Sequence, residues 1–202
     1  KEFTSGNGDG CVNILRAPRR GQHIRCYGED VHRGELILKK GTLIRPYEIA
    51  LLAAQGIKKI LAIARPRVAL LATGDELVEA SQPLSPGKIR NSNGPALAAA
   101  ISKWGALPLY QGIVPDDPGL MKTALRRSLK SCDMLLVSGG VSVGDFDYTK
   151  TLLEELGLQV VFWKAAIKPG KPLLFGLYRN KPVFGLPGNP ISAMVCVAGS
   201  HR

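Results

Sequence analysis

The sequence is poor in aromatic residues, has few cysteines and contains no long hydrophobic run. Phe, Trp and Tyr make up 6% of its 202 residues, so it offers no evident stacking platform for nucleic-acid bases. No apolar run approaches the roughly 20 residues that span a bilayer, and the first ten residues do not resemble a signal peptide. We therefore expect neither a membrane partner nor a nucleic-acid partner.

The four cysteines, Cys11, Cys26, Cys132 and Cys196, are far apart and lack the spacing of metal-ligand pairs. They are typical of reduced thiols, so we expect a cytoplasmic protein. Positive charge is in excess, with 27 Lys and Arg against 16 Asp and Glu, a net charge of +11. This balance indicates an anionic partner. Because the basic residues are scattered rather than gathered in a run, a phosphorylated small molecule or an oxyanion accounts for this charge without a nucleic acid.

The pattern along the chain changes near residue 65. Residues 1–64 contain short β-like runs separated by glycines, and we expect them to form a partial β-rich and linker segment. Within it the sequence predicts a helix from Pro46 to about Gln55, followed by Gly56. The predicted strands of this segment are 11–15, 23–25, 35–38, 42–44 and 58–62.

Residues 65–202 alternate strand-like and helix-like segments. The continuous apolar run 67–72 is typical of a strand buried on both faces of a parallel sheet. The other predicted strands are 107–114, 133–137, 159–163, 172–178 and 181–186, and the helices 95–104, 117–130, 148–156 and 191–198. We expect a three-layer α/β/α domain with a mostly parallel sheet, in which the last two strands form a hairpin through Arg179-Asn180.

One loop in this domain is rich in glycine and follows a buried strand. It is the stretch SGGVSVGDFDYTK, from Ser138 to Lys150. Gly139, Gly140 and Gly144 can adopt positive φ and let an anion approach the main chain, and the next helix points its positive end at the same place. Asp145 and Asp147 suit such a loop if Mg²⁺ lies between it and a phosphate. Alternatively, Asp147 only caps the helix and the glycines only turn the chain.

Three further loops have the composition of ligand-binding loops. Thr73-Gly74-Asp75-Glu76 follows the first buried strand, where its acidic pair could hold a metal, accept from a ribose hydroxyl or simply start a turn. Residues 168–172, KPGKP, place two ammonium groups on a stiff loop suited to an anion, or form a solvated basic turn. Residues 185–192, GLPGNPIS, join a strand to a helix N-terminus and could form an anion pocket from backbone donors.

Taken in order and spacing, five motifs resemble one family. They are GDEL, IRNSNGPAL, SGGVSVGDFDYTK, KPGKP and GLPGNPIS. Together they are similar to the MoeA-type molybdopterin molybdenumtransferases, which include the E domain of gephyrin. The resemblance covers about residues 21–198, and residues 21–57 resemble the stretch that precedes the molybdopterin-binding domain in that family.

The resemblance implies an enzyme of molybdenum cofactor biosynthesis. Members of the family insert molybdenum from molybdate into adenylylated molybdopterin in a Mg²⁺-dependent step that releases AMP. By position, the catalytic residues would be Asp75, Asp145, Asp147, Lys168 and Lys171, with Asp75 and Asp147 binding the metal. The residues expected to bind the pterin nucleotide or molybdate are Thr73, Gly74, Glu76, Asn93, Ser138, Gly139, Gly140, Val141, Ser142, Gly144, Pro172, Pro187, Gly188, Asn189 and Ser192.

The resemblance also bears on assembly. It implies a homodimer in the full-length protein, and it implies that this chain is a fragment without most of the N-terminal β-rich region and without a C-terminal β domain. Two other functions remain open from the sequence. One is molybdopterin adenylyltransferase activity, which the α/β domain also resembles. The other is a non-enzymatic scaffold of the gephyrin kind.

Overall fold

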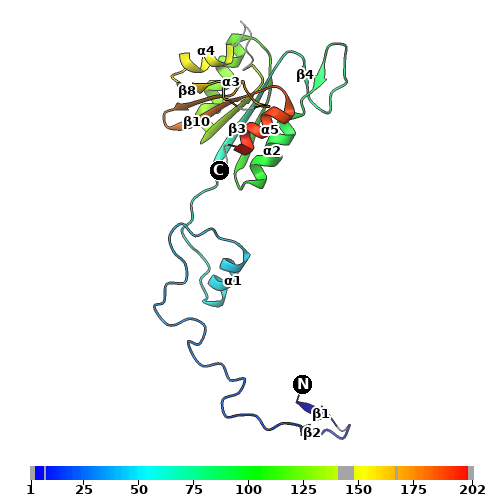
Figure 1. The fold of residues 1–202 in the computed structure, drawn as a ribbon, viewed down its shortest axis with the longest axis vertical. Helices are drawn as coiled ribbons and strands as arrows, with labels where there is room; N and C mark the ends of the chain where they lie inside the picture. The colour runs from blue at the N-terminus through cyan, green and yellow to red at the C-terminus, as the bar shows by residue number, and fades with distance from the viewer. Residues whose placement is uncertain (1–2, 7, 141–147, 167, 200–202) are drawn as a thin grey trace. The chain divides into compact units, whose positions relative to one another are not determined.

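The structure is a computed structural model that describes residues 3–6, 8–140, 148–166 and 168–199. The chain divides into two units, Lys1–Ala62 and Ile63–Arg202, which are both drawn in Figure 1. None of the helices in the described ranges is both long and apolar enough to cross a membrane.

The first unit has little regular structure. Strand β1 (Thr4–Gly6) pairs antiparallel with β2 (Val12–Ile14). Helix α1 (Pro46–Ala54) has a proline in its first turn, and its C-cap Gln55 is followed by Gly56 at a φ of 72°. A glycine at positive φ lets the last carbonyl groups of a helix find hydrogen-bond donors without steric strain. The predicted helix and its end are therefore confirmed.

Four strands predicted in this unit do not form: residues 23–25, 35–38, 42–44 and 58–62 are turns or irregular. The backbone hydrogen bonds there are local, for example from Ile24 N–H to the Gly21 carbonyl and from Thr42 N–H to the Lys39 carbonyl. A short β-like run becomes a strand only when a partner strand takes up its backbone groups. The described part of this unit supplies no such partner for these four runs.

The second unit is built on a six-stranded sheet with the order β6-β3-β7-β10-β9-β8. The strands are β3 (Arg67–Thr73), β6 (Leu107–Val114), β7 (Met134–Ser138), β8 (Gln159–Trp163), β9 (Leu174–Tyr178) and β10 (Lys181–Leu186). Strands β6, β3, β7 and β10 are parallel, and β9 is antiparallel to both of its neighbours. The predicted mostly parallel α/β sheet is confirmed. A separate short parallel pair joins β4 (Leu77–Val78) to β5 (Ile89–Arg90).

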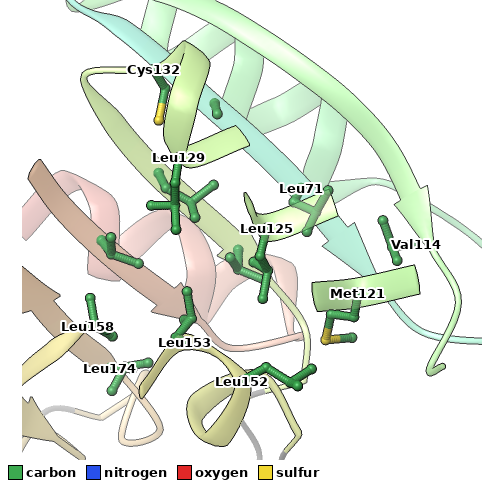
Figure 2. Packing of buried hydrophobic residues seen from close by; sticks show 14 residues of the cluster. Leu71, Val114, Met121, Leu125, Leu129, Cys132, Leu152, Leu153, Leu158 and Leu174 are labelled. Carbon is green, nitrogen blue, oxygen red and sulfur yellow. The ribbon is translucent and has the colours of Figure 1, made fainter. Parts of the chain in front are cut away.

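Helices cover both faces of the sheet, which gives three layers (Figure 1). They are α2 (Asn93–Lys103), α3 (Pro118–Ser131), α4 (Tyr148–Glu155) and α5 (Pro190–Gly199). Alternate residues of β3 face opposite layers. Leu71 packs with Leu125 of α3 and Leu153 of α4 (Figure 2), whereas Leu70 belongs to the cluster of α2 and α5. The core is therefore continuous on both sides of the central strands.

Local sequence explains the ends of two elements. Asp117 accepts a hydrogen bond from Leu120 N–H at 2.7 Å and Pro118 is the first helical residue, so α3 begins where Asp-Pro predicts. Strands β9 and β10 are joined by Arg179 and Asn180, with φ of 47° and 64°. Two left-handed residues match the twist of a tight hairpin, so the predicted hairpin is confirmed as well.

Candidate functional site

The carboxyl ends of β3, β7 and β10 meet at one edge of the sheet, because these strands are parallel neighbours. The chain leaves β3 for β6 on one side and later enters β7 on the other side, so the order reverses between β3 and β7. Open α/β sheets bind ligands at such a switch point. The loops that follow these strands begin at Gly74, Gly139 and Pro187.

Asn93, at the start of α2, ties two of these strand ends together. Its side-chain Nδ2 donates to Ser138 Oγ at 2.7 Å and to the Gly188 carbonyl at 2.9 Å. Its Oδ1 is buried and has no partner within the described part of the chain. A buried acceptor left without a partner costs free energy, so the Oδ1 atom of Asn93 is a candidate acceptor for a ligand hydrogen bond.

Gly139 and Gly140 bring the main chain very close to Thr73. Their φ values are 93° and 65°, in the left-handed region that glycine adopts without strain. A Cβ on Gly139 would lie 2.4 Å from the Thr73 carbonyl oxygen, and one on Gly140 would lie 2.4 Å from Thr149 Oγ1. Gly139 N–H donates to the Leu186 carbonyl at 3.1 Å, which links β7 to β10 beyond the end of the ladder.

Thr73 is the second residue of this edge with an unsatisfied polar atom. It is buried, and its Oγ1 has no partner among the described residues. A hydroxyl can donate one hydrogen bond and accept two. Thr73 and Asn93 thus present a buried hydroxyl and a buried carbonyl whose bonding capacity is unused inside the described chain.

Asp75 lies against Asp116, a residue that the sequence interpretation missed. Asp116 N–H donates to Asp75 Oδ1 at 3.1 Å, and Asp75 N–H donates weakly to Asp116 Oδ2 at 3.4 Å. Each carboxylate keeps one oxygen with no partner among the described residues. The sequence did contain a sign of this contact. Pro115-Asp116-Asp117 follows β6, the parallel neighbour of β3, so its carboxylates lie at the same end of the sheet as Asp75.

The fit of Mg²⁺ to these carboxylates can be tested on the described residues. They contain no group of three or more His, Cys, Asp or Glu side chains that could hold a metal ion. However, Mg²⁺ keeps several waters and needs only one or two protein carboxylates. The exposed oxygens of Asp75 and Asp116 meet that lower requirement. Asp145 and Asp147 lie outside the described residues.

Glu76 and Gly74 complete the first loop. A Cβ on Gly74 would lie 2.5 Å from a carboxylate oxygen of Glu76, so the side chain of Glu76 folds back over Gly74. Gly74 N–H donates to the Val114 carbonyl at 3.4 Å. This loop is therefore held against β6 at the same edge of the sheet.

A short polar network holds the N-terminus of α2. Asn91 Nδ2 donates to the Tyr110 hydroxyl, which donates to Glu79 Oε1, both at 2.6 Å. Asn91 Oδ1 also accepts from Gly94 N–H at 2.9 Å. Burial, and secondly the bond to Glu79, raise the pKa of Tyr110 above its ordinary value. The network fixes the residues on either side of Asn93.

The loop with two lysines reaches the same edge because β9 runs backwards. Leu174, where β9 begins, pairs with Gly185 near the end of β10. The Lys171 carbonyl accepts from Ala165 N–H at 2.9 Å and the Gly170 carbonyl from Cys196 Sγ at 3.6 Å, which anchors the backbone. Lys168 and Lys171 are exposed, whereas Pro172 is half-buried. Among the described residues, neither lysine ammonium group forms an ion pair.

The turn into α5 differs from its sequence interpretation. Asn189 Oδ1 accepts from Ile191 N–H at 3.0 Å and from Ser192 N–H at 3.3 Å, so Asn189 caps the helix. These two donors are therefore already used, and the anion pocket expected from them is not formed by these groups. Pro187 and Ser192 are buried, and Gly188 contributes its carbonyl to Asn93.

The structure thus gathers most of the described candidate residues at one edge. Those around the ends of β3, β7 and β10 are Thr73, Gly74, Asp75, Glu76, Asn93, Ser138, Gly139, Gly140, Pro187, Gly188, Asn189 and Ser192. Lys168, Lys171 and Pro172 reach that edge through the start of β9. Val141, Ser142, Gly144, Asp145 and Asp147 lie outside the described residues.

Two models of known protein families match this chain. Residues 69–201 match the family model described as a probable molybdopterin binding domain, which is more than half of the chain. The chain belongs to this molybdopterin-binding domain family. Residues 1–56 match a second model, the MoeA N-terminal region (domain I and II). The loops described above all lie on the molybdopterin-binding domain.

Two curated relatives of this chain have the same name. The chain is 41% identical over 195 residues to the molybdopterin molybdenumtransferase of Haemophilus influenzae, and the alignment covers 96% of this chain and 48% of that protein. The Bacillus subtilis molybdopterin molybdenumtransferase is 39% identical, with coverages of 94% and 44%. The chain therefore spans about half the length of these curated relatives.

A solved structure agrees with the family. The molybdopterin biosynthesis MoeA protein of Pyrococcus horikoshii aligns with a TM-score of 0.78 at 34% identity. The alignment covers 98% of this chain and 49% of that one. The α/β architecture of the molybdopterin-binding domain is thus shared with a MoeA structure.

Proposed function

We propose that this chain supplies the pterin-nucleotide and molybdate site of a molybdopterin molybdenumtransferase. The observation that most supports this is the edge formed by β3, β7 and β10, where Asn93 bonds both Ser138 and Gly188 and where only glycine fits beside Thr73. The names of the curated relatives support the same activity. In this proposal the substrates are adenylylated molybdopterin and molybdate, and the product released is AMP.

Each group at the edge has a chemical role in the proposal. Thr73 Oγ1 and Asn93 Oδ1, both buried and without described partners, hydrogen-bond the ligand. The backbone at Gly139 and Gly140 lets a phosphate approach closely. Lys168 and Lys171 hold the oxyanion by charge-assisted hydrogen bonds.

The proposal includes a Mg²⁺ ion bound by carboxylates. Asp75 and Asp116 would hold the ion with water completing its shell, and Asp147 would join them by resemblance to the family. Bound there, the ion would neutralise charge that develops on a phosphate. In the full-length protein we propose a homodimer, again by resemblance.

A calorimetric titration tests this proposal. Adenylylated molybdopterin should bind the chain with a stoichiometry of one in the presence of Mg²⁺, and molybdate should bind more tightly after the nucleotide than before it. AMP release should then be measured after molybdate is added, with the full-length protein in parallel. Binding of neither ligand to either protein would refute the proposal.

A further inference from the structure

The second unit has a cleft far from the carboxyl edge of its sheet. The cleft has a volume of about 550 Å³ and lies between the second half of α3, the end of α4 and the β9–β10 turn. Because α3 leads into β7 and the turn leads into β10, the cleft is at the amino ends of these strands. It is thus separate from the site around Thr73 and Asn93.

Positive charge dominates the lining of the cleft. Four cations contribute to it: Arg126, Lys130, Arg179 and Lys181. The lining also includes Glu155, but its carboxylate is 2.5 Å from Lys122 Nζ and is already paired. Within the described ranges none of the four cations forms an ion pair. Like charges gathered in a concave surface raise the local concentration of an anion.

Two of the cations are held in place. Lys181 Nζ donates to the Leu129 carbonyl at 2.8 Å, and the Arg179 guanidinium lies 5.5 Å from the centre of the Tyr178 ring. Arg179 also has a φ of 47°, a conformation that asparagine or glycine adopts more readily. Arg126 and Lys130, four residues apart on α3, share one face of that helix. The cations therefore approach the cleft from two sides.

The lining of the cleft also includes Leu129, Leu156 and Tyr178. Leu129 is buried, and Leu156 and Tyr178 are half-buried and pack against the core behind it. The volume is in the range of small-molecule sites, roughly 300–1,000 Å³. Strands β9 and β10 are both interior strands, so neither offers a free edge beside the cleft for a peptide to pair with. These features favour a compact ligand over a peptide.

We propose that this cleft binds a nucleoside polyphosphate, in addition to the ligands proposed for the carboxyl edge of the sheet. Its phosphates would contact Arg126, Lys130 and Arg179, and its ring would lie against Leu156 and Tyr178. Lys181, held by the Leu129 carbonyl, would contribute charge at the base of the cleft. The proposal does not depend on the function proposed for the other edge.

The test follows backbone amide NMR signals of the whole chain during titration with ATP without metal, at about 0.15 M salt so that weak surface attraction is screened. Saturable shifts are expected at residues 129–130 and 178–181. Arg126→Ala and Lys130→Ala should each weaken the affinity about tenfold, as expected for one charge-assisted contact. Arg127→Ala removes the same charge from the next position of α3, outside the lining, and should change it less than about twofold.

Three results would overturn the proposal. The first is the absence of saturable shifts at 129–130 and 178–181, whatever happens at residues 73 and 93. The second is an equal loss of affinity in Arg126→Ala and Arg127→Ala, which would indicate diffuse attraction by surface charge. The third is tighter binding of an acidic peptide than of ATP at the same residues. Inorganic tripolyphosphate is the last ligand to be compared. It should bind more weakly than ATP because it lacks the nucleoside.

Discussion

The side-chain nitrogen of Asn93 lies 2.7 Å from Ser138 Oγ, and the two residues are 45 positions apart in the chain. Asn93 begins α2, and Ser138 ends β7. The same nitrogen reaches the Gly188 carbonyl in the turn before α5. One amide group therefore sets the spacing of a helix, a strand end and a loop at the edge where we propose that the pterin nucleotide binds.

Replacing that amide should weaken both folding and ligand binding. Asn93→Ala removes two hydrogen bonds, so we expect a loss of about 1–3 kcal/mol in the free energy of unfolding. It also removes the unpartnered Oδ1, so affinity for adenylylated molybdopterin should fall at least about tenfold. Urea unfolding and calorimetry measure the two effects. Ser102→Ala, on the exposed side of the same helix, is the control and should leave binding unchanged.

The two glycines after β7 should differ in their tolerance of a methyl group. In Gly139→Ala the new Cβ would meet the backbone carbonyl of Thr73 at 2.4 Å, which cannot move away easily. In Gly140→Ala the nearest atoms are side-chain hydroxyls, those of Thr149 at 2.4 Å and of Thr73 at 2.9 Å, rather than a backbone atom. We therefore expect Gly139→Ala to be the more destabilising, by more than about 2 kcal/mol in total.

Gly105 provides the matched control for both changes. Its φ is 83°, yet nothing lies within 4 Å of a Cβ built there. Gly105→Ala should cost only the left-handed strain, about 1–2 kcal/mol. Thermal unfolding of the three variants measures the order, and equal losses at Gly105 and Gly139 would show that Thr73 does not crowd this loop.

The exposed lysines should contribute to anion binding and little to stability. Lys168→Ala or Lys171→Ala should each weaken binding of molybdate or nucleotide by about 1.5–3 kcal/mol, the value of a hydrogen bond to a charged group. Unfolding should change by less than about 0.5 kcal/mol because both side chains are exposed. Lys103→Ala, at the exposed end of α2, removes the same charge elsewhere. Unchanged affinity in both loop variants would favour a solvated basic turn.

Tyr110 should make the stability fall at alkaline pH. Its pKa in the folded state is raised above the ordinary value of 10.0 that applies when the chain is unfolded. Above about pH 10 the unfolded state therefore loses this proton first and binds fewer protons than the folded state, so stability declines as pH rises. Below pH 10 both states keep the proton and the group adds no pH dependence.

Tyr110→Phe isolates this contribution from the other groups that ionise at high pH. The variant loses the hydrogen bonds to Asn91 and Glu79 and should be less stable at pH 7. Its stability should then fall less steeply than that of the natural chain between about pH 10 and pH 11. Parallel slopes for the two proteins would contradict the raised pKa.

The sequence predicted the second unit well because its elements are set by local patterns. The apolar runs of β3 and β7, the Asp117-Pro118 helix start and the hairpin at Arg179-Asn180 all depend on neighbouring residues. The sequence predicted where β8 lies in the chain, but it did not predict that β8 is the outermost strand of the sheet, next to β9. Strand order depends on which segments meet in space, and nothing local encodes it.

The same reasoning explains the errors. Short β-like runs such as 35–38 and 42–44 have suitable residues but no partner strand in the described unit, and strand formation depends on pairing. Asp116 was missed because its role comes from contact with Asp75, 41 positions away. Asn189 was placed correctly in the turn, but its capping of Ile191 depends on the side-chain rotamer. The sequence thus predicted elements and loop positions but not the contacts between them.

The pairing of β3 with β7 has a consequence for how the protein is made. Arg67, the first residue of β3, donates its N–H to the side chain of Asp133, which directly precedes β7 and lies 66 positions further along the chain. The ribosome therefore produces α2, β6 and α3 before the strand that covers the second edge of β3 exists. Closing so long a loop makes folding slow. Until then the strand that contains Leu70 and Leu71 has one edge with unpaired backbone N–H and C=O groups beside apolar side chains, and such an edge is prone to aggregate in a nascent chain.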